Sequence, residues 1–201
     1  MKLYFSPGAC SLAVHIALYE QGATFDAVKV DLATHRLADG GDYLAVSPRG
    51  YVPLLELDDG ARHTEVAALL QYIADREPSQ ALIGAVGTPR RLAVTECLAF
   101  LATELHKVFG PLWQKDAAES TRMAALAKLG KRFREFDQLL AQRDYIAGDY
   151  SVADPYAFTV LNWTNFLSMP LGEYPRVQAY LDRLAARSAV QRALRAEGLL
   201  Q

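Results

Sequence analysis

Apolar and polar positions at the start of the chain follow the pattern of a strand, a helix and a second strand. Residues 2–5 form a short apolar run that ends at the turn residues 6–8. Apolar positions then recur at helical spacing over residues 11–21, and Gly22 is suited to end that helix. Residues 25–32 alternate in part, as a half-buried strand does. The pattern therefore predicts a β-α-β unit.

The next stretch predicts a hairpin followed by a helix. A loop with a short helix around Tyr43 comes first. A strand-like run over 51–57 then precedes Asp58-Asp59-Gly60, and a second short strand is expected over 61–63. Asp-Gly between two strand-like runs is a strong hairpin signal. The helix that follows is expected to have Thr64 as its cap.

Composition changes after this helix, and the rest of the chain has helical periodicity. Residues 78–88 contain Pro and Gly with little charge, which is typical of an interdomain linker. Apolar stripes with three- and four-residue spacing follow the linker. Their members are Leu98, Leu101, Leu105, Phe109, Leu126, Leu129, Phe133, Phe136, Leu140, Ala153, Tyr156, Ala157, Val160, Leu161, Thr164, Leu181, Leu184 and Ala185. We expect an α/β domain over 1–77 and an all-α domain over 89–201.

Bulk composition is that of a folded protein with no strong charge preference. Of the 201 residues, 51% are hydrophobic and 22% are charged, and the formal net charge is −2. A nearly neutral chain gives no electrostatic reason to expect nucleic acid or an anionic membrane as a partner. No apolar run approaches the ~18 residues that a membrane-spanning helix needs. The first residues also lack the apolar segment of a secretory signal, so we expect a cytoplasmic protein.

The two cysteines, Cys10 and Cys97, suggest neither a disulfide framework nor a metal site. They are too few for the former and lack the ligand spacing of the latter. Ala13 stands where a C-x-x-C redox pair would need its second cysteine. This cysteine usage fits a reducing compartment.

Cys10 is a candidate for chemistry because it lies where a Pro-Gly turn meets the start of a predicted helix. The positive end of the helix dipole favours a thiolate there, and such positions lower the thiol pKa from ~8.5 to about 4–7. The alternative is a small buried cysteine without a chemical role. Position alone gives these two interpretations of Cys10 equal weight. Cys97 lies in the middle of a predicted helix, and we expect it to be a packing residue of the core.

Two further segments could contact an extended, peptide-like ligand. A cis peptide at Val52-Pro53 would present the backbone of Val52 for strand-like pairing, although proline is also permitted at the start of a strand. Glu65 at a helix start could recognise an ammonium group, beside backbone N–H groups that bind a carboxylate. Taken alone, Glu65 is sufficiently explained by capping and dipole complementarity, which is the favoured interpretation before other context is considered.

The second predicted domain contains one candidate pair and one folding motif. Glu104 and His106 are two positions apart on a helix, so they do not share a face. His106 adjoins the apolar stripe, where it is either an interior histidine or a partner that donates to a thiolate or takes its proton. Ser151-Val152-Ala153-Asp154 has the form of a capping box that opens a helix over 153–167.

Together these motifs resemble the glutathione S-transferases, specifically the bacterial beta class. The matches occur in the expected order from the first residues to the last, so the resemblance covers essentially the whole chain. The matching stretches are 2–11 (KLYFSPGACS), 47–53 (SPRGYVP), 57–60 (LDDG), 64–65 (TE), 103–107 (TELHK), 151–154 (SVAD) and 196–199 (AEGL).

The resemblance implies a thioredoxin-like domain that holds glutathione as co-substrate and an all-helical domain that receives a hydrophobic electrophile. It also implies a homodimer and no metal. Cys10 would contact the glutathione sulfur or form a mixed disulfide with it, and His106 would act beside it. The residues implied to bind glutathione are Cys10, His35, Val52, Glu65, Val66, Thr103, Glu104 and His106.

Several positions depart from the beta-class pattern. His35 stands where Lys is frequent, Val66 replaces a small residue and Ala99 replaces Asn. Val108 and Gly110 alter the expected wall of the pocket. These changes bear on glutathione affinity and on the choice of electrophile more than on the fold.

The leading hypothesis is a transferase that conjugates glutathione to electrophilic small molecules, with thiol-disulfide exchange through Cys10 as an additional activity. One alternative is a binding or interaction protein that keeps the fold but has weak or no catalysis, for which His35, Val66 and Ala99 argue. Another is a thiol-disulfide reductase that acts through Cys10 alone.

Overall fold

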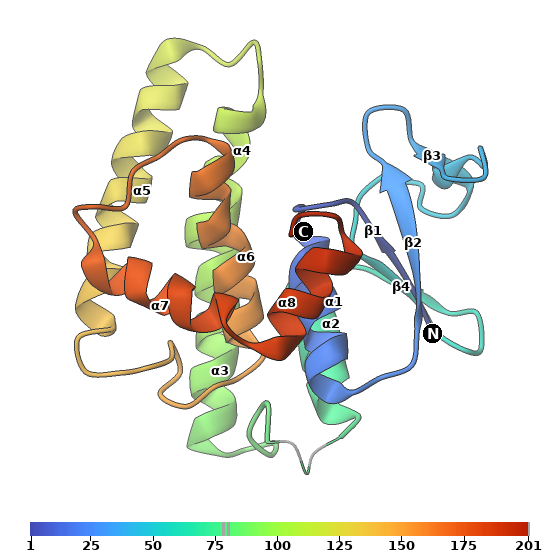
Figure 1. The fold of residues 1–201 in the computed structure, drawn as a ribbon, viewed down its shortest axis with the longest axis horizontal. Coiled ribbons are helices and arrows are strands. Elements are labelled where there is room, and N and C mark those ends of the chain that lie inside the picture. Colours follow the sequence, from blue (N-terminus) through green and yellow to red (C-terminus); the bar gives the residue numbers. More distant parts are fainter. Residues whose placement is uncertain (78, 80, 201) are drawn as a thin grey trace. The chain divides into compact units, whose positions relative to one another are not determined.

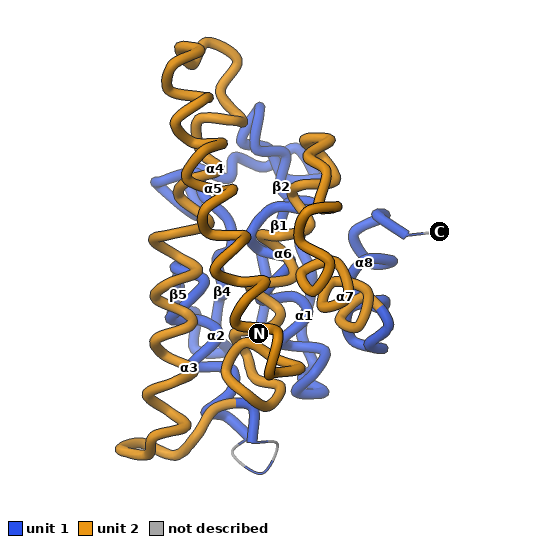
Figure 2. The backbone as a smooth tube through the Cα atoms, turned by 90° about the vertical axis from the view of Figure 1, so that its left-hand side faces the viewer, with its two compact units in different colours: residues 1–82, 186–201 blue, residues 83–185 orange. Residues whose placement is uncertain are grey.

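The computed structural model describes residues 1–77, 79 and 81–200. They form two compact units, unit 1 within 1–82 and 186–201, and unit 2 over 83–185 (Figure 2). Pro78 and Gln80, at the start of the predicted linker, lie outside the described residues. The predicted domain division, 1–77 and 89–201, stays a prediction.

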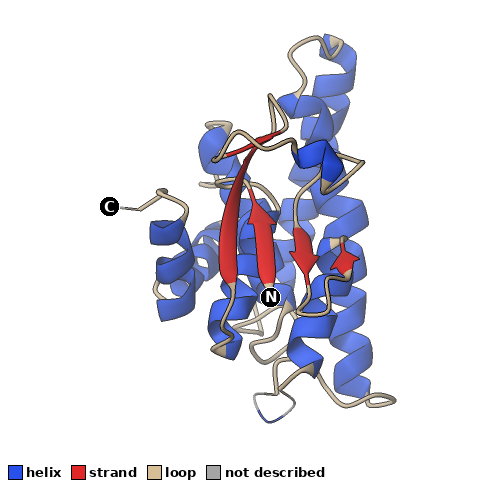
Figure 3. Ribbon diagram, turned by 90° about the vertical axis from the view of Figure 1, so that its right-hand side faces the viewer, coloured by secondary structure: helices blue, strands red, loops and turns tan. Residues whose placement is uncertain are grey.

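Unit 1 contains a five-stranded mixed sheet of order β3-β2-β1-β4-β5 (Figures 1 and 3). β1 pairs in parallel with β2, and the other neighbours are antiparallel. The β-α-β unit and the hairpin predicted from the sequence are confirmed, while the two-residue β3 was not predicted. The strands are β1 (Lys2–Phe5), β2 (Asp26–Asp31), β3 (Arg36–Leu37), β4 (Leu54–Glu56) and β5 (Arg62–His63).

The α-helices described in unit 1 are α1 (Ser11–Gln21), α2 (Val66–Asp75) and α8 (Ser188–Ala196), and η1 (Tyr43–Ala45) is a single 3-10 turn. α1 contacts β1, α2 and α8 and is buried over most of its length. Gly22 adopts a left-handed φ of 71° and ends α1, as predicted.

The start of α2 differs from the prediction. Thr64 was expected to cap this helix, but Glu65 occupies the N-cap position, and no side-chain hydrogen bond caps the helix there. The assignment of the cap to Thr64 was therefore wrong. Glu65 has a φ of 71°, so the chain turns sharply at this residue before the helix begins.

Side chains are buried on both faces of the sheet. Leu3, Tyr4 and Phe5 of β1 are each at most 5% exposed, and successive side chains along a strand point to opposite faces. Tyr4 belongs to a cluster formed by residues from β2, η1 and the segment that ends in β4. The buried members of this cluster are Tyr4, Val30, Tyr43, Val52 and Leu54.

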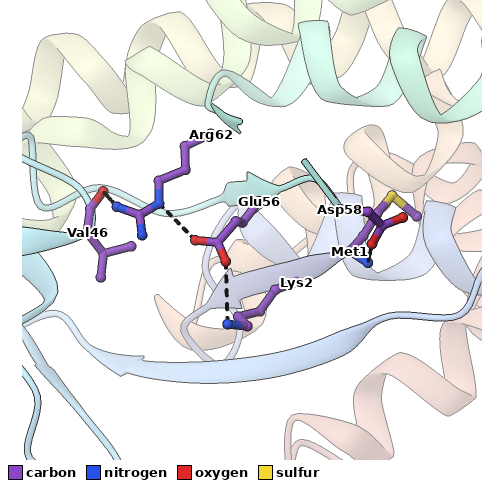
Figure 4. A network of polar contacts seen from close by, with 6 residues as sticks. All are labelled: Met1, Lys2, Val46, Glu56, Asp58 and Arg62. Carbon is purple, nitrogen blue, oxygen red and sulfur yellow. Dashed lines mark hydrogen bonds and ion pairs between the residues drawn. The ribbon is translucent and has the colours of Figure 1, made fainter. Parts of the chain in front are cut away.

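A polar network connects the strands at the surface of unit 1 (Figure 4). Glu56 of β4 accepts hydrogen bonds from Lys2 of β1 at 3.4 Å and from Arg62 of β5 at 2.8 Å. Arg62 also donates to the carbonyl oxygen of Val46 at 3.2 Å. The hydrogen bond from Arg62 is the main reason why the pKa of Glu56 lies below its usual value. Such partly exposed pairs contribute little stability each, but they favour one register.

Unit 2 is built from helices, as predicted. α6 contacts α3, α7 and the π-helical segment η3, and it is buried over nearly its whole length. No described helix of the chain combines the length and apolarity that crossing a membrane requires. The segments are α3 (Pro89–Phe100), η3 (Leu101–His106), α4 (Lys107–Trp113), α5 (Glu119–Leu139), α6 (Ala153–Phe166) and α7 (Pro175–Ala185).

The predicted capping residues lie at the start of α6. The Ser151 hydroxyl accepts the N–H of Ala153 at 3.3 Å, and the Asp154 carboxylate accepts the N–H of Ser151 at 2.8 Å. Tyr180 also donates to Asp154, at 2.7 Å. The N-cap position is Val152, one residue later than the capping box implied. The folding role is confirmed with this shift.

Candidate functional site

Cys10 lies at the N-cap position of α1, where the sequence predicted it. Its Sγ donates to the carbonyl oxygen of Val52 at 3.2 Å. The Val52-Pro53 peptide bond is cis. Two candidates more than forty positions apart in the sequence are therefore adjacent, at the positive end of a helix dipole.

The turn that carries Cys10 is held by a residue near the end of the chain. Gly8, with a φ of 73°, donates its N–H to Oε2 of Glu197 at 2.8 Å. The other carboxylate oxygen of Glu197 lies 2.9 Å from Nδ1 of His15, and both of these side chains are fully buried. Sequence reasoning did not identify Glu197 as a partner of this turn, since only its presence in the matched stretch 196–199 pointed to it.

Glu65 and Val66 lie together at the start of α2. The Glu65 side chain is 75% exposed, and its carboxylate is 3.6 Å from Arg49. The Val66 side chain is buried, so its extra bulk is directed into the packed interior. An exposed carboxylate can accept hydrogen bonds from the ammonium group of an amino acid, and the first N–H groups of the helix can donate to its carboxylate.

His35 follows β2 and packs against Gly50. It has a left-handed φ of 52°, which is uncommon for a residue with a side chain. A Cβ atom on Gly50 would come within 2.6 Å of the His35 ring, so only glycine fits there. Nδ1 of His35 is buried without a hydrogen-bond partner in the described part of the chain.

Thr103 and Glu104 belong to η3 in unit 2. The Thr103 hydroxyl donates to the carbonyl oxygen of Ala99 at 3.0 Å. Glu104 accepts from Nε of Arg132 at 2.9 Å and forms an ion pair with Lys128 at 3.3 Å. The hydrogen bonds from Arg132 and then Lys128 hold the pKa of Glu104 below its usual value, so its carboxylate is ionised at neutral pH.

His106, the last residue of η3, has different neighbours from Glu104, as predicted. Its Nδ1 lies 2.7 Å from the Tyr156 hydroxyl, and its ring packs edge-to-face on Trp163. Burial, and then the nearby charge of Lys107, lower the pKa of His106 to about 4. The imidazole is therefore neutral at physiological pH.

Three aromatic side chains of unit 2, Phe109, Trp113 and Trp163, form one cluster. Trp163 packs edge-to-face on Phe109 and on Trp113, with ring centroids 5.4 and 5.9 Å apart. Phe109 and Trp163 are buried, whereas Trp113 is 47% exposed. Trp113 thus offers a partly open aromatic surface.

Cys97 behaves as a packing residue. Its Sγ lies 3.6 Å from the carbonyl oxygen of Ile146, and burial raises the pKa of its thiol to about 11. It lines a cavity of about 400 Å³ in unit 2, beside Phe100 and Leu139. A thiol with such a pKa is a poor nucleophile.

Comparison with known proteins places both parts of the chain in one family. Residues 7–76 match the glutathione S-transferase N-terminal domain, and residues 100–188 match the C-terminal domain. The chain is 44% identical to glutathione S-transferase GstA of Escherichia coli O157:H7 over 200 residues, 99% of this chain and 100% of the relative.

Solved structures agree in fold over the full length. The bacterial beta-class glutathione S-transferase of Sphingomonas chungbukensis is 45% identical, with a TM-score of 0.95 and all of both chains covered. A sphingomonad glutathione S-transferase complexed with glutathione is 44% identical, with a TM-score of 0.94, and the match covers 99% of this chain and 100% of that one. The chain therefore belongs to the glutathione S-transferase family of transferases, with bacterial beta-class enzymes among its relatives.

Proposed function

We propose that this chain conjugates glutathione to electrophilic small molecules. The observation that carries the proposal is the position of Cys10, at the start of α1 and hydrogen-bonded to the Val52 backbone. Relatives at more than 40% identity are named glutathione S-transferases, and one was solved with glutathione bound. These names do not favour the alternative of a non-catalytic binding protein.

The reaction needs a sulfur anion held in place. Glutathione loses its thiol proton to solvent, and the thiolate forms a bond to an electrophilic carbon. In a displacement, the leaving group departs with the electron pair of the broken bond. The positive end of α1 and hydrogen-bond donors near the sulfur favour the thiolate, and binding both reactants removes much of the entropic barrier.

Eight residues are proposed to hold glutathione. Cys10 accompanies the sulfur, the Val52 backbone pairs with the cysteinyl unit, and Glu65 with the Val66 N–H holds the γ-glutamyl end. His35 faces the glycine carboxylate. The residues proposed to complete the site from η3 are Thr103, Glu104 and His106.

Three further proposals follow from the resemblance to the glutathione S-transferases, and they concern the electrophile, the assembly and the location of the protein. The electrophile is a hydrophobic compound that contacts Trp113, which is about half exposed. The chain works as a cytoplasmic homodimer, and Cys10 also exchanges disulfides with glutathione mixed disulfides.

Calorimetric titration and turnover assays test this function. We expect saturable glutathione binding and conjugation with at least one member of a panel of aryl halides. Cys10→Ala should abolish reduction of mixed disulfides and affect conjugation less, whereas Cys97→Ala serves as the matched cysteine control and should change neither. A protein that neither binds glutathione nor turns over any member of either substrate class contradicts the proposal.

A further inference from the structure

Tyr156 carries a hydroxyl group on the buried face of α6, where its neighbours in the stripe are apolar. The side chain is 2% exposed. Its oxygen lies 2.7 Å from Nδ1 of His106. An unpaired buried hydroxyl costs about 1–3 kcal/mol, so tyrosine rather than phenylalanine at this position indicates that the hydroxyl has a function there.

The hydrogen bond between Tyr156 and His106 has a preferred direction. His106 is neutral, since burial and Lys107 lower its pKa to about 4. A neutral imidazole has one N–H group and one bare nitrogen. A phenol is a much better donor than acceptor, and the bare nitrogen is the stronger acceptor of the two groups, so the hydroxyl donates to Nδ1. The ring proton then lies on Nε2.

Helix α6 also fixes the plane of the His106 ring. Tyr156 and Trp163 are seven positions apart, about two helical turns, and so lie on the same face of α6. The imidazole centroid is 5.8 Å from the Tyr156 ring at 89° and 4.9 Å from the Trp163 ring at 70°. Both are edge-to-face contacts, a favoured aromatic arrangement. Nδ1 is therefore held at Tyr156, and Nε2 is directed away from it.

We propose that Tyr156 is a positioning residue that makes His106 a hydrogen-bond donor, through Nε2, to the sulfur of glutathione. This inference rests on the proposed function and decides between the two roles that the sequence left open for His106. With its proton on Nε2, the imidazole stabilises the thiolate and does not take the thiol proton, which leaves to solvent. The sulfur–carbon bond forms and the leaving group departs without any proton transfer through Tyr156.

Nitrogen-15 NMR of the full chain, labelled at histidine, tests the tautomer directly. The chain has four histidines, and His106→Gln identifies the signals of His106. The expected wild-type result is a protonated Nε2 and a bare Nδ1, with loss of this single tautomer in Tyr156→Phe. A protonated Nδ1 in the wild type overturns the proposal, as does an unchanged tautomer in Tyr156→Phe.

Tyr180→Phe is the matched control for this measurement. It also removes a buried tyrosine hydroxyl, one that donates to Asp154 at 2.7 Å in the same unit. We expect it to lower stability while the His106 signals keep the wild-type pattern. If Tyr180→Phe shifts the tautomer as Tyr156→Phe does, the effect is general loosening of the unit and the proposal fails.

A double-mutant cycle tests whether Tyr156 acts through His106. Tyr156→Phe should lower kcat for conjugation about three- to ten-fold, the size of one lost hydrogen bond, with little change in KM for glutathione. The same substitution should have almost no further effect in His106→Gln. Equal losses in both backgrounds overturn the proposal. Absence of conjugation in the wild type defeats the proposed function instead, and the tautomer measurement still decides whether Tyr156 sets the state of His106.

Discussion

The buried Glu197 carboxylate supports the turn that carries Cys10, although the two lie far apart in the sequence. Its two carboxylate oxygens accept from Gly8 at 2.8 Å and contact His15 at 2.9 Å, with no exposure to solvent. Glu197→Gln keeps the size but replaces one acceptor by a donor, which leaves a buried group unpaired. We expect the free energy of unfolding to fall by about 1–3 kcal/mol, measured as a lower urea midpoint.

The control for this substitution is Glu135→Gln. Glu135 forms a partly exposed i,i+3 ion pair with Arg132 at 2.7 Å. Exposed pairs of this kind contribute about 0–1 kcal/mol, so the urea midpoint should move little. Equal midpoint shifts for the two variants would show that the buried contacts of Glu197 are not structural supports.

His106 gives a pH-dependent contribution to stability. Its pKa is lowered to about 4 in the folded chain from 6.5. Between these values the unfolded imidazole binds a proton that the folded one does not, so protons favour unfolding and stability rises with pH through this window. The slope from one such group is at most about 1.4 kcal/mol per pH unit.

The wild type and His106→Gln should therefore differ in this window. Groups common to both chains cancel in the difference between their unfolding free energies. We expect wild-type stability relative to the variant to increase from pH 4 to 6.5 and to level off above it, in urea unfolding at a series of pH values. A difference that stays constant across the window argues against a neutral buried imidazole.

The sequence identified Cys10 and His106 as candidates but not the side chains that hold them. Tyr156 counted only as a member of an apolar stripe, because hydrophobic periodicity does not distinguish a buried phenol from a buried phenyl ring. Its partner is fifty positions away in the sequence. Contacts over such separations depend on tertiary packing, which local patterns do not specify.

At the scale of elements, a glycine at a helix end can be compared with a glycine inside a helix. Gly22 ends α1 at a φ of 71°, whereas Gly110 lies inside α4 without a positive φ, directly before Pro111. Apart from the residues next to it in the chain, an added Cβ meets nothing within 4 Å at either position. Gly22→Ala should lower the free energy of unfolding by about 1–2 kcal/mol because the left-handed conformation strains alanine. Gly110→Ala should change it by less, because the gain in helix propensity is opposed by the clash between the added Cβ and the ring of Pro111. Thermal or urea unfolding measures both variants, and a loss for Gly110→Ala as large as that for Gly22→Ala would contradict the role of the left-handed conformation at Gly22.

Elements with a strong local pattern were predicted closely, and those set by packing were not. α1 occupies Ser11–Gln21 as expected, because both its apolar period and its glycine stop are local signals. The π-helical η3 was expected to be ordinary helix, since a change from i→i+4 to i→i+5 hydrogen bonding leaves no clear mark on hydrophobic spacing. Such segments occur often at functional sites, and this one contains Thr103, Glu104 and His106.

At the scale of the whole molecule, the predicted class, an α/β part followed by helices, is confirmed by the sheet and by the family matches. The sequence did not reveal that residues 186–201 group with the N-terminal residues in unit 1. α8 was expected to continue the helical part, because nothing in its apolar face specifies which surface it covers. α8 packs against α1, a helix far from it in the sequence, and local sequence patterns do not specify such a contact.

This return of the chain to unit 1 has a consequence for biosynthesis. The ribosome completes the sheet of unit 1 before it reaches unit 2, whereas α8 and Glu197 emerge only after all of unit 2. Throughout that interval the surface of α1 that α8 covers stays open, and the turn carrying Cys10 lacks the carboxylate that accepts from Gly8. An apolar helix surface left uncovered on a nascent chain is prone to aggregation or chaperone capture. Unit 1 thus reaches its final form only after all of unit 2 has been translated.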